Sequence, residues 1–171
     1  MRSVTRGDLI SGIQMNSEQN INWLVHDHRK YDDALDECEM AADAGEWKNA
    51  KRLFNDFVTD LKLHMQMEDE VLYPLFVEDN GDPDGVITDL SEEHDYLVRL
   101  VHDLAYIIKA NDFDHFLDSL EPLHKAMNQH NKHEEQVFKN MANQSILMRR
   151  DEIMERLRAV QNKQGGRSWD F

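Results

Sequence analysis

Apolar residues recur at spacings of three and four along most of this chain, with charged residues between them. That spacing places the apolar side chains on one face of an α-helix. It predicts four long helices, over about residues 17–44, 46–78, 86–110 and 113–142, and a shorter amphipathic helix over about 145–162. Pro122 lies inside the fourth segment, where its ring should kink the helix or mark a late start.

Turn-forming residues separate these segments. Gly45 ends the first helix, because glycine readily adopts the left-handed conformation of a helix C-cap. Residues 79–85 (DNGDPDG) form the clearest loop, and residues 111–112 form a shorter one. The expected organisation is an N-terminal arm (1–16), a helical bundle (17–142), and a C-terminal helix and tail (143–171).

The sequence repeats itself after 66 residues without a gap. The shift places Leu24 on Leu90, His28 on His94, Trp47 on Phe113, His64 on His130, and Glu68 on Glu134. Such a repeat indicates two helical hairpins packed with approximate twofold symmetry around one core. The predicted fold class is therefore all-α: an antiparallel four-helix bundle with a short additional C-terminal helix.

Two pairs of histidine and glutamate interrupt the apolar stripes in the same phase. His64 and Glu68 are four residues apart, and so are His130 and Glu134. Residues with this spacing lie one above the other on a helix, so each pair projects an imidazole and a carboxylate in one direction. That direction is the predicted core of the bundle.

His28 and His94 lie on the inner stripes of the other two helices. Facing hairpins would bring all of these groups to one level of the bundle. Buried carboxylates are very costly unless they are paired or bind metal, and no basic residue lies on the inner stripes. Cations accept neutral imidazole and neutralise glutamate. The predicted metal ligands are His28, His64, Glu68, His94, His130 and Glu134.

Simpler interpretations exist for each feature alone. A single inward histidine is more often a hydrogen-bonded core residue, and a single His-x-x-x-Glu pair is often a surface pair. Two such pairs in register with two further inward histidines are far more specific. His26 is two residues from His28 and points away from the inner stripe. The remaining histidines fall outside the pattern, and we expect them to be solvated: His102, His115, His124 and His133.

The composition excludes several classes of partner and site. A formal net charge of −15 repels phosphate backbones and anionic lipids, so we expect neither nucleic acid nor a membrane as a partner. Cys38 is the one cysteine, which excludes an internal disulfide and a thiolate cluster. The N-terminal residues lack the apolar core of a secretion signal, so the cytoplasm is the expected location.

The segments around the six predicted ligands resemble the hemerythrin-like, HHE cation-binding domain family. The matching segments are DHRKYDDAL, HMQMEDEVLYP, EEHDYL and HNKHEEQVF, one on each predicted helix, and the resemblance covers roughly residues 20–142. It implies an up-down four-helix bundle and a non-haem di-iron centre with an oxo or hydroxo bridge. It also implies that Glu68 and Glu134 bridge the two irons, with the four histidines as terminal ligands.

The chain departs from the oxygen-carrying hemerythrins at two ligand positions. Those proteins have a second histidine four residues after the third-helix histidine, where this chain has Val98. Their fourth-helix carboxylate is usually an aspartate five residues after the histidine, whereas Glu134 follows at four. The set of four histidines and two glutamates is more similar to the bacterial branch, which includes iron–sulfur repair and stress-response proteins.

Three further residues are candidates for the pocket or for support of the ligands. Asp32 follows His28 by four residues and occupies the repeat-equivalent position of Val98. Its carboxylate could hydrogen-bond a ligand or a metal-bound water, although an exposed acid on the helix flank is the simpler interpretation. Tyr31 and Val98 complete this set.

The sequence favours a non-haem di-iron protein that binds or reacts with oxygen, peroxide or nitric oxide, in sensing or stress protection. Peroxide or nitric oxide chemistry would make it an enzyme. The alternatives are an iron binding or storage module, a reversible oxygen carrier, and an interaction protein with a structural metal site. Manganese could replace iron, whereas zinc is disfavoured because it usually takes four ligands in a closed site.

Overall fold

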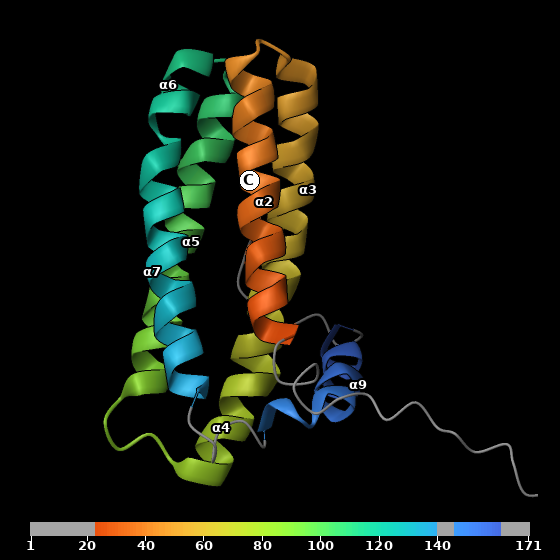
Figure 1. Cartoon of the computed structure of the whole chain (residues 1–171), viewed down its shortest axis with the longest axis vertical. Coiled ribbons are helices and arrows are strands. Elements are labelled where there is room, and N and C mark those ends of the chain that lie inside the picture. The colour runs from red at the N-terminus through yellow and green to blue at the C-terminus, as the bar shows by residue number, and fades with distance from the viewer. Residues whose placement is uncertain (1–22, 140–145, 162–171) are drawn as a thin grey trace, which may run out of the picture.

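The computed structural model describes residues 23–139 and 146–161. The bundle consists of α2 (Trp23–Asp43), α3 (Trp47–Met67), α5 (Val86–Lys109) and α7 (Leu120–Phe138). These helices run alternately up and down, with α2 beside α3 and α7, and α5 beside α7 and α3 (Figure 1). The predicted all-α up-down bundle is therefore confirmed.

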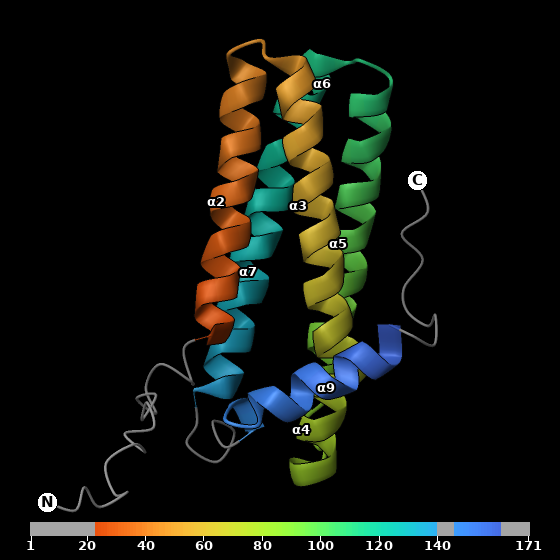
Figure 2. The ribbon, with the colours of Figure 1, turned by 90° about the vertical axis from the view of Figure 1, so that its right-hand side faces the viewer.

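Shorter elements complete the described part of the chain. A π-helical turn, η1 (Glu68–Leu72), and α4 (Tyr73–Asn80) continue α3, and α6 (Phe113–Asp118) precedes α7. The predicted C-terminal helix is α9 (Arg150–Gln161), which lies across the bundle where α4 projects (Figure 2). Among the described helices, none has the length and apolar character needed to cross a membrane. Three predicted segments lie outside the described residues: the arm (1–16), the end of the fourth predicted helix (140–142) and the tail from residue 162.

Local sequence sets the helix boundaries. Gly45 adopts a φ of 75°, and the backbone N–H of Glu46 donates to the carbonyl of Ala41 at 2.8 Å, which closes the end of α2. The Asp82 carboxylate accepts from the backbone N–H groups of Ile87 and Thr88, each at 3.1 Å. These bonds cap α5 by satisfying amides that have no partner within the helix.

The fourth predicted helix is divided in two. Ser119 separates α6 from α7, with φ −93° and ψ −2°. Pro122 is the third residue of α7, where a backbone N–H would have no partner within the helix. The break agrees with the prediction that Pro122 would kink the fourth helix or mark a late start, although α7 begins two residues earlier, at Leu120.

Pro74 gives a physical reason for the π-helical turn. In a regular α-helix its ring would clash with the carbonyl of Glu70, and it has no N–H to donate. In the wider turn, the N–H of Tyr73 reaches back five residues to the carbonyl of Glu68. The repeat-equivalent residues 134–138 belong to the regular helix α7. The turn therefore breaks the twofold symmetry beside a predicted metal ligand.

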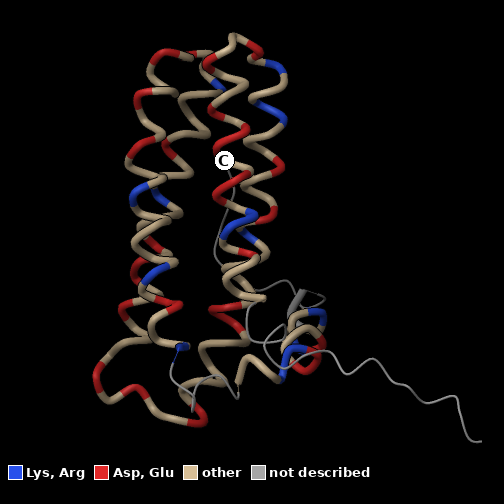
Figure 3. The backbone as a smooth tube through the Cα atoms, in the orientation of Figure 1, with Lys and Arg blue, Asp and Glu red and all other residues tan. Residues whose placement is uncertain are grey.

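The repeat is otherwise visible in the packing. Trp47 and Phe113 are repeat equivalents, and their rings stack at 3.8 Å between centroids with an interplanar angle of 15°. They join the α2–α3 turn to the start of α6, at the end of the bundle opposite α9 (Figure 1). Acidic residues are distributed along the whole length of the bundle and outnumber basic ones (Figure 3).

The apolar core consists of two separate clusters. The α6-end core includes Leu35, Phe54, Leu104 and Leu123. The α9-end core includes Leu72, Leu90, Phe138 and Ile153, so helix α9 contributes directly to it.

A polar layer separates these two cores. On α2, Leu24 belongs to the α9-end core and Tyr31 to the α6-end core, with His28 between them. The same order holds on α5, where Leu90 and Leu97 lie on either side of His94. The predicted ligands therefore occupy one level of the bundle, as the sequence indicated.

Candidate metal centre

The six predicted ligands lie together in the interior of the bundle. Their side chains are between 0% and 5% exposed, although every one is polar or ionisable. Each comes from a different position on the four helices: His28 on α2, His64 on α3, Glu68 at the start of η1, His94 on α5, and His130 and Glu134 on α7. Within residues 23–139 and 146–161, these six are the buried residues with imidazole or carboxylate side chains.

The six residues form two groups that share Glu68. In one group, ligand atoms of His28, His64, Glu68 and Glu134 all lie within 4.8 Å of one another. In the other, those of Glu68, His94 and His130 meet the same limit. Each group therefore offers two histidines, and a glutamate lies between the two groups.

Short distances confirm how closely these atoms converge. Nε2 of His64 lies 2.6 Å from one carboxylate oxygen of Glu68, and Nε2 of His94 lies 3.2 Å from the other. Nε2 of His28 lies 3.0 Å from Oε2 of Glu134. Glu68 thus directs one oxygen toward each group, which is the arrangement that a bridging carboxylate requires.

Several of the converging atoms have no hydrogen-bond partner among the described residues. They are Nε2 of His28, both ring nitrogens of His64, and both carboxylate oxygens of Glu68 and Glu134. Buried polar groups are nearly always satisfied, and an unsatisfied carboxylate is especially costly. Imidazole and carboxylate are common ligands for iron and manganese, so bound cations would satisfy these atoms. The residues present therefore fit a pair of metal ions.

Carboxylates outside the group of six hold three of the histidines. Nδ1 of His28 lies 2.9 Å from Glu135, and Nδ1 of His94 lies 2.9 Å from Asp69. Nδ1 of His130 lies 2.9 Å from Glu93. In a metal-loaded centre, an N–H at Nδ1 that donates to a carboxylate leaves the Nε2 lone pair directed at the ion.

Sequence reasoning missed these three carboxylates, although a signal was available. Each is the immediate neighbour of a predicted ligand, and Asp69 and Glu135 are themselves repeat equivalents. An acidic residue directly after Glu68 and after Glu134 could have been identified as a partner for the histidine of the adjacent helix.

Electrostatics show how the centre is balanced when the histidines bind protons. Burial alone would lower the pKa of His28, but the negative charge of Glu134, whose Oε2 lies 3.0 Å from Nε2, raises it to about 9. Burial likewise opposes the charge on His94, yet the hydrogen bond to Asp69 and the negative charge of Glu68 raise its pKa to about 9. Both imidazoles are therefore cationic at neutral pH in the metal-free protein.

The shared glutamate is the complementary anion. Burial alone would raise the pKa of Glu68, but the positive charge of His64 and the close approach of His94 lower it well below its usual range. A buried carboxylate between imidazoles thus stays ionised. The metal-free centre is an ion-paired cluster, in which protons on the imidazoles balance the carboxylate charge that metal cations would otherwise balance.

Tyr73 lies against the centre beside His94. The Tyr73 hydroxyl is 3.4 Å from Nε2 of His94, and its ring stacks on the imidazole at 5.4 Å between centroids. Burial, followed by the charges of Glu134 and Glu68, raises the pKa of Tyr73 well above its usual range. Its hydroxyl therefore remains a hydrogen-bond donor. Sequence reasoning did not single out Tyr73, because its position depends on the π-helical turn.

The three candidate pocket residues lie at different distances from the centre. Tyr31 is buried, and its ring centroid is 4.8 Å from that of His64. Asp32 is half-buried, and burial raises the pKa of its carboxyl despite the opposing charge of His28. Val98 is half-buried and packs against the α6-end core.

The expectation that four histidines outside the centre are solvated was wrong in two cases. His133 is half-buried, and its Nδ1 lies 2.7 Å from the carboxylate of Glu93 that also contacts His130. His124 is half-buried, and its Nε2 lies 2.9 Å from Glu39 on α2. The acidic surface provides partners for them, which the helical period alone did not reveal.

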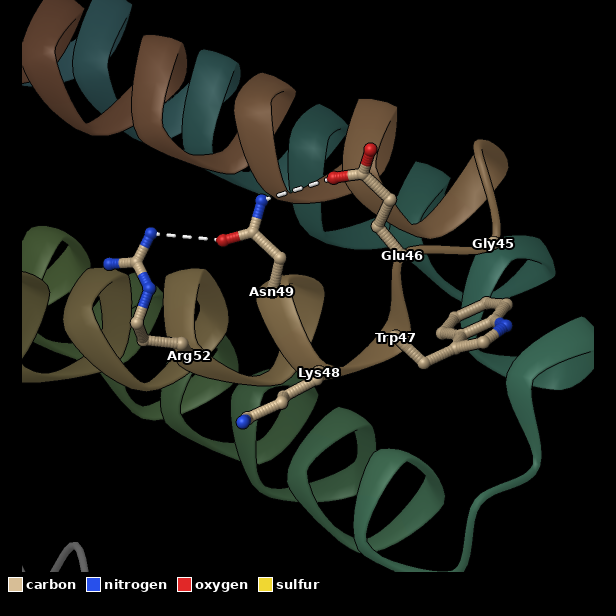
Figure 4. A pocket seen from close by; sticks show the side chains of 6 residues that line it. All are labelled: Gly45, Glu46, Trp47, Lys48, Asn49 and Arg52. Atoms are coloured by element: carbon tan, nitrogen blue, oxygen red, sulfur yellow. Dashed lines mark hydrogen bonds between the residues drawn. The ribbon is translucent and has the colours of Figure 1, made fainter.

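A hollow at the α2–α3 turn lies far from the centre, at the opposite end of α3 from His64 (Figures 1 and 4). Asn49 bridges its polar side, because its amide donates to Glu46 at 3.4 Å and accepts from Arg52 at 3.0 Å. Trp47 lines the hollow as well. This exposed network joins successive turns of one helix end and contributes no ligand to the centre.

Comparison with known proteins agrees with this geometry. The sequence model of the hemerythrin HHE cation binding domain matches residues 19–142. The comparison found no matching curated protein and no matching solved structure. The family match spans most of the chain and all six residues of the buried cluster. The chain belongs to the hemerythrin HHE cation-binding family.

Proposed function

We propose that the buried cluster holds two iron ions and that the protein binds or reacts with a small oxidant or diatomic molecule, such as oxygen, peroxide or nitric oxide. The observation that supports this most directly is the division of the cluster into two groups that share Glu68. His28 and His64 would be the histidine ligands of one ion, and His94 and His130 those of the other. We further propose a role in sensing or stress protection.

The ligand set favours iron over zinc. A structural zinc ion usually has four protein ligands in a closed tetrahedral site. Here two histidines and shared carboxylates would leave each ion with room for a non-protein ligand. A di-iron centre supplies electrons to a small oxidant or a binding position for a diatomic molecule. Manganese is compatible with the same donors.

The absence of a third histidine at one ion argues against reversible oxygen carriage. The oxygen-carrying hemerythrins have a further histidine ligand at the position that Val98 occupies in this chain. Val98 packs against the α6-end core. Both groups then have equal numbers of histidines, so each ion would keep a coordination position for a non-protein ligand. Reversible carriage depends on excluding water and side reactions, which a more open centre does less well.

Oxidation in air is the experiment that tests this proposal. We expect purified protein to contain about two iron ions per chain and to absorb in the near ultraviolet, with a new charge-transfer band after azide addition. Protein that has been reduced anaerobically should oxidise rapidly on exposure to oxygen and should not return oxygen under vacuum. Optical spectra and metal analysis measure both results.

Each alternative function gives a different outcome. Recovery of oxygen under vacuum would make the protein a reversible carrier. A colourless protein with stoichiometric zinc would support a structural site instead. Iron well above two ions per chain would indicate storage.

Tyr73 is the residue best placed to influence a bound small molecule. Its hydroxyl is a buried donor beside His94, so we expect it to hydrogen-bond an anion held at that side of the centre. Tyr73→Phe should weaken azide binding by about 10-fold, because hydrogen bonds to charged groups contribute about 1.5 to 3 kcal/mol. Iron content should not change. Titration with azide measures the effect, and Tyr106→Phe, at a 73% exposed site, is the matched control.

A further inference from the structure

The four histidines of the centre are not supported equally. His28, His94 and His130 each have an Nδ1 at 2.9 Å from a carboxylate of an adjacent helix. His64 differs, because its Nδ1 is buried and has no hydrogen-bond partner among the described residues. Both histidines of one group are therefore held by carboxylates, whereas the other group has one held and one unsupported histidine.

The repeat shows which residue would have supported His64. His130 is held by Glu93, the residue before His94 on α5. The repeat equivalent of Glu93 is Asp27, the residue before His28 on α2. By symmetry Asp27 would hold His64, but its side chain is one methylene shorter than that of glutamate.

Other contacts place Asp27 on the correct side of α2. Tyr31 lies one turn further along the helix, and its ring is 4.8 Å from the His64 ring between centroids. Asp27 and Tyr31 are four residues apart and therefore lie on the same face of α2. The Asp27 side chain is 36% exposed and lies 3.8 Å from His26. Its carboxylate is thus on the His64 side of α2 and half-exposed.

We propose that the two metal positions have unequal affinity: the His94–His130 position binds its ion more tightly than the His28–His64 position, because Asp27 does not reach His64. The inference rests on the proposed ligand set. Carboxylates that hold the outer nitrogen of a metal-binding histidine typically change metal affinity by about 10- to 100-fold. The less supported position is therefore the one that fills last and loses its ion first to a chelator.

Single-position variants measure the two affinities separately. His64→Ala leaves the His94–His130 position, and His130→Ala leaves the His28–His64 position. Calorimetric titration of each metal-free variant with Co²⁺ should give one ion per chain, with about 10- to 100-fold weaker binding in His130→Ala. Equal affinities, or tighter binding in His130→Ala, would overturn the inference.

A gain of affinity provides the sharper test, because it does not depend on damage to the protein. Asp27→Glu adds the missing methylene and should tighten Co²⁺ binding in the His130→Ala background by about 10-fold or more. Glu93→Asp makes the reverse change and should weaken binding in the His64→Ala background. Asp33→Glu, at an exposed site on the same helix, is the control and should have no effect.

These measurements distinguish failure of the inference from failure of the proposed function. Two ions bound with equal affinity, unchanged by Asp27→Glu, would contradict the inference and leave the di-iron proposal intact. Wild-type protein that binds no Co²⁺ or Fe²⁺ at the centre would contradict both.

Discussion

Replacing Glu68 with glutamine is expected to remove most of both metal ions. Glu68 belongs to both groups of ligands, is completely buried, and directs a different oxygen toward each group. Glutamine has nearly the same shape but no charge, so it cannot neutralise two cations. We expect metal content to fall from about two ions per chain to well below one, because both ions lose a ligand together. Elemental analysis of the purified variant measures this loss.

The same substitution should also lower stability. Ions that bind the folded chain stabilise it, and removing one partner of a buried ion pair costs about 3 to 5 kcal/mol. For a domain of this size we expect the melting temperature to fall by roughly 10 °C. His102→Ala, at an exposed site on α5, should change neither metal content nor melting temperature. Retention of two ions by Glu68→Gln would show that the ligand set is wrong.

Metal loading at neutral pH is expected to release about two protons per chain, because His28 and His94 are cationic in the metal-free protein and must be neutral to bind metal. With pKa values of about 9, both imidazoles are almost fully protonated at pH 7. Metal affinity should therefore rise steeply from pH 6.5 toward pH 9. A pH indicator in weakly buffered solution, during anaerobic addition of Mn²⁺, measures the release.

The stability of the metal-free protein should change in the opposite direction. The pKa values of His28 and His94 are raised from 6.5 to about 9 in the folded chain, so their contribution is fully present below pH 6.5. It is lost as pH rises through 9, and it amounts to roughly 3 kcal/mol for each group. The melting temperature of metal-free protein should fall across this window. Proton release at pH 7 no larger than at pH 9.5 would contradict the assignment of charges.

The fold was predictable because its main signals are local. The three- and four-residue spacing of apolar side chains predicted the helices of the bundle, and the 66-residue repeat indicated two equivalent hairpins. The π-helical turn was not predictable from the period, because it results from the conflict between Pro74 and the carbonyl of Glu70. The division at Ser119 was only partly foreseen, through Pro122.

The six central residues of the site were predicted from the sequence, whereas the carboxylates that hold the histidines were not. In-phase interruption of an apolar stripe identifies side chains that point inward, and the structure brings all six together. The carboxylates that hold the histidines come from helix flanks, where acidic residues are abundant in this chain. Glu93 can be selected among them only from its distance to His130 on the neighbouring helix, and the helical period of the sequence gives no such distance.

The division of the apolar core into two clusters has a consequence for the cooperativity of unfolding. Hydrocarbon contacts usually link all parts of a small domain, so that it unfolds as one unit. Here a layer of imidazoles and carboxylates lies between the α6-end core and the α9-end core. Ions that cross-link four helices at this level would couple the two halves far more strongly than protons do.

Metal loss would then change how the chain opens as well as how stable it is. The α9-end core contains the shorter helices α4 and α9. Without ions, we expect this end to open as a local unit more readily than the α6 end. Loss of the proposed ions would then be measurable as faster cleavage of the α9 end by an added protease.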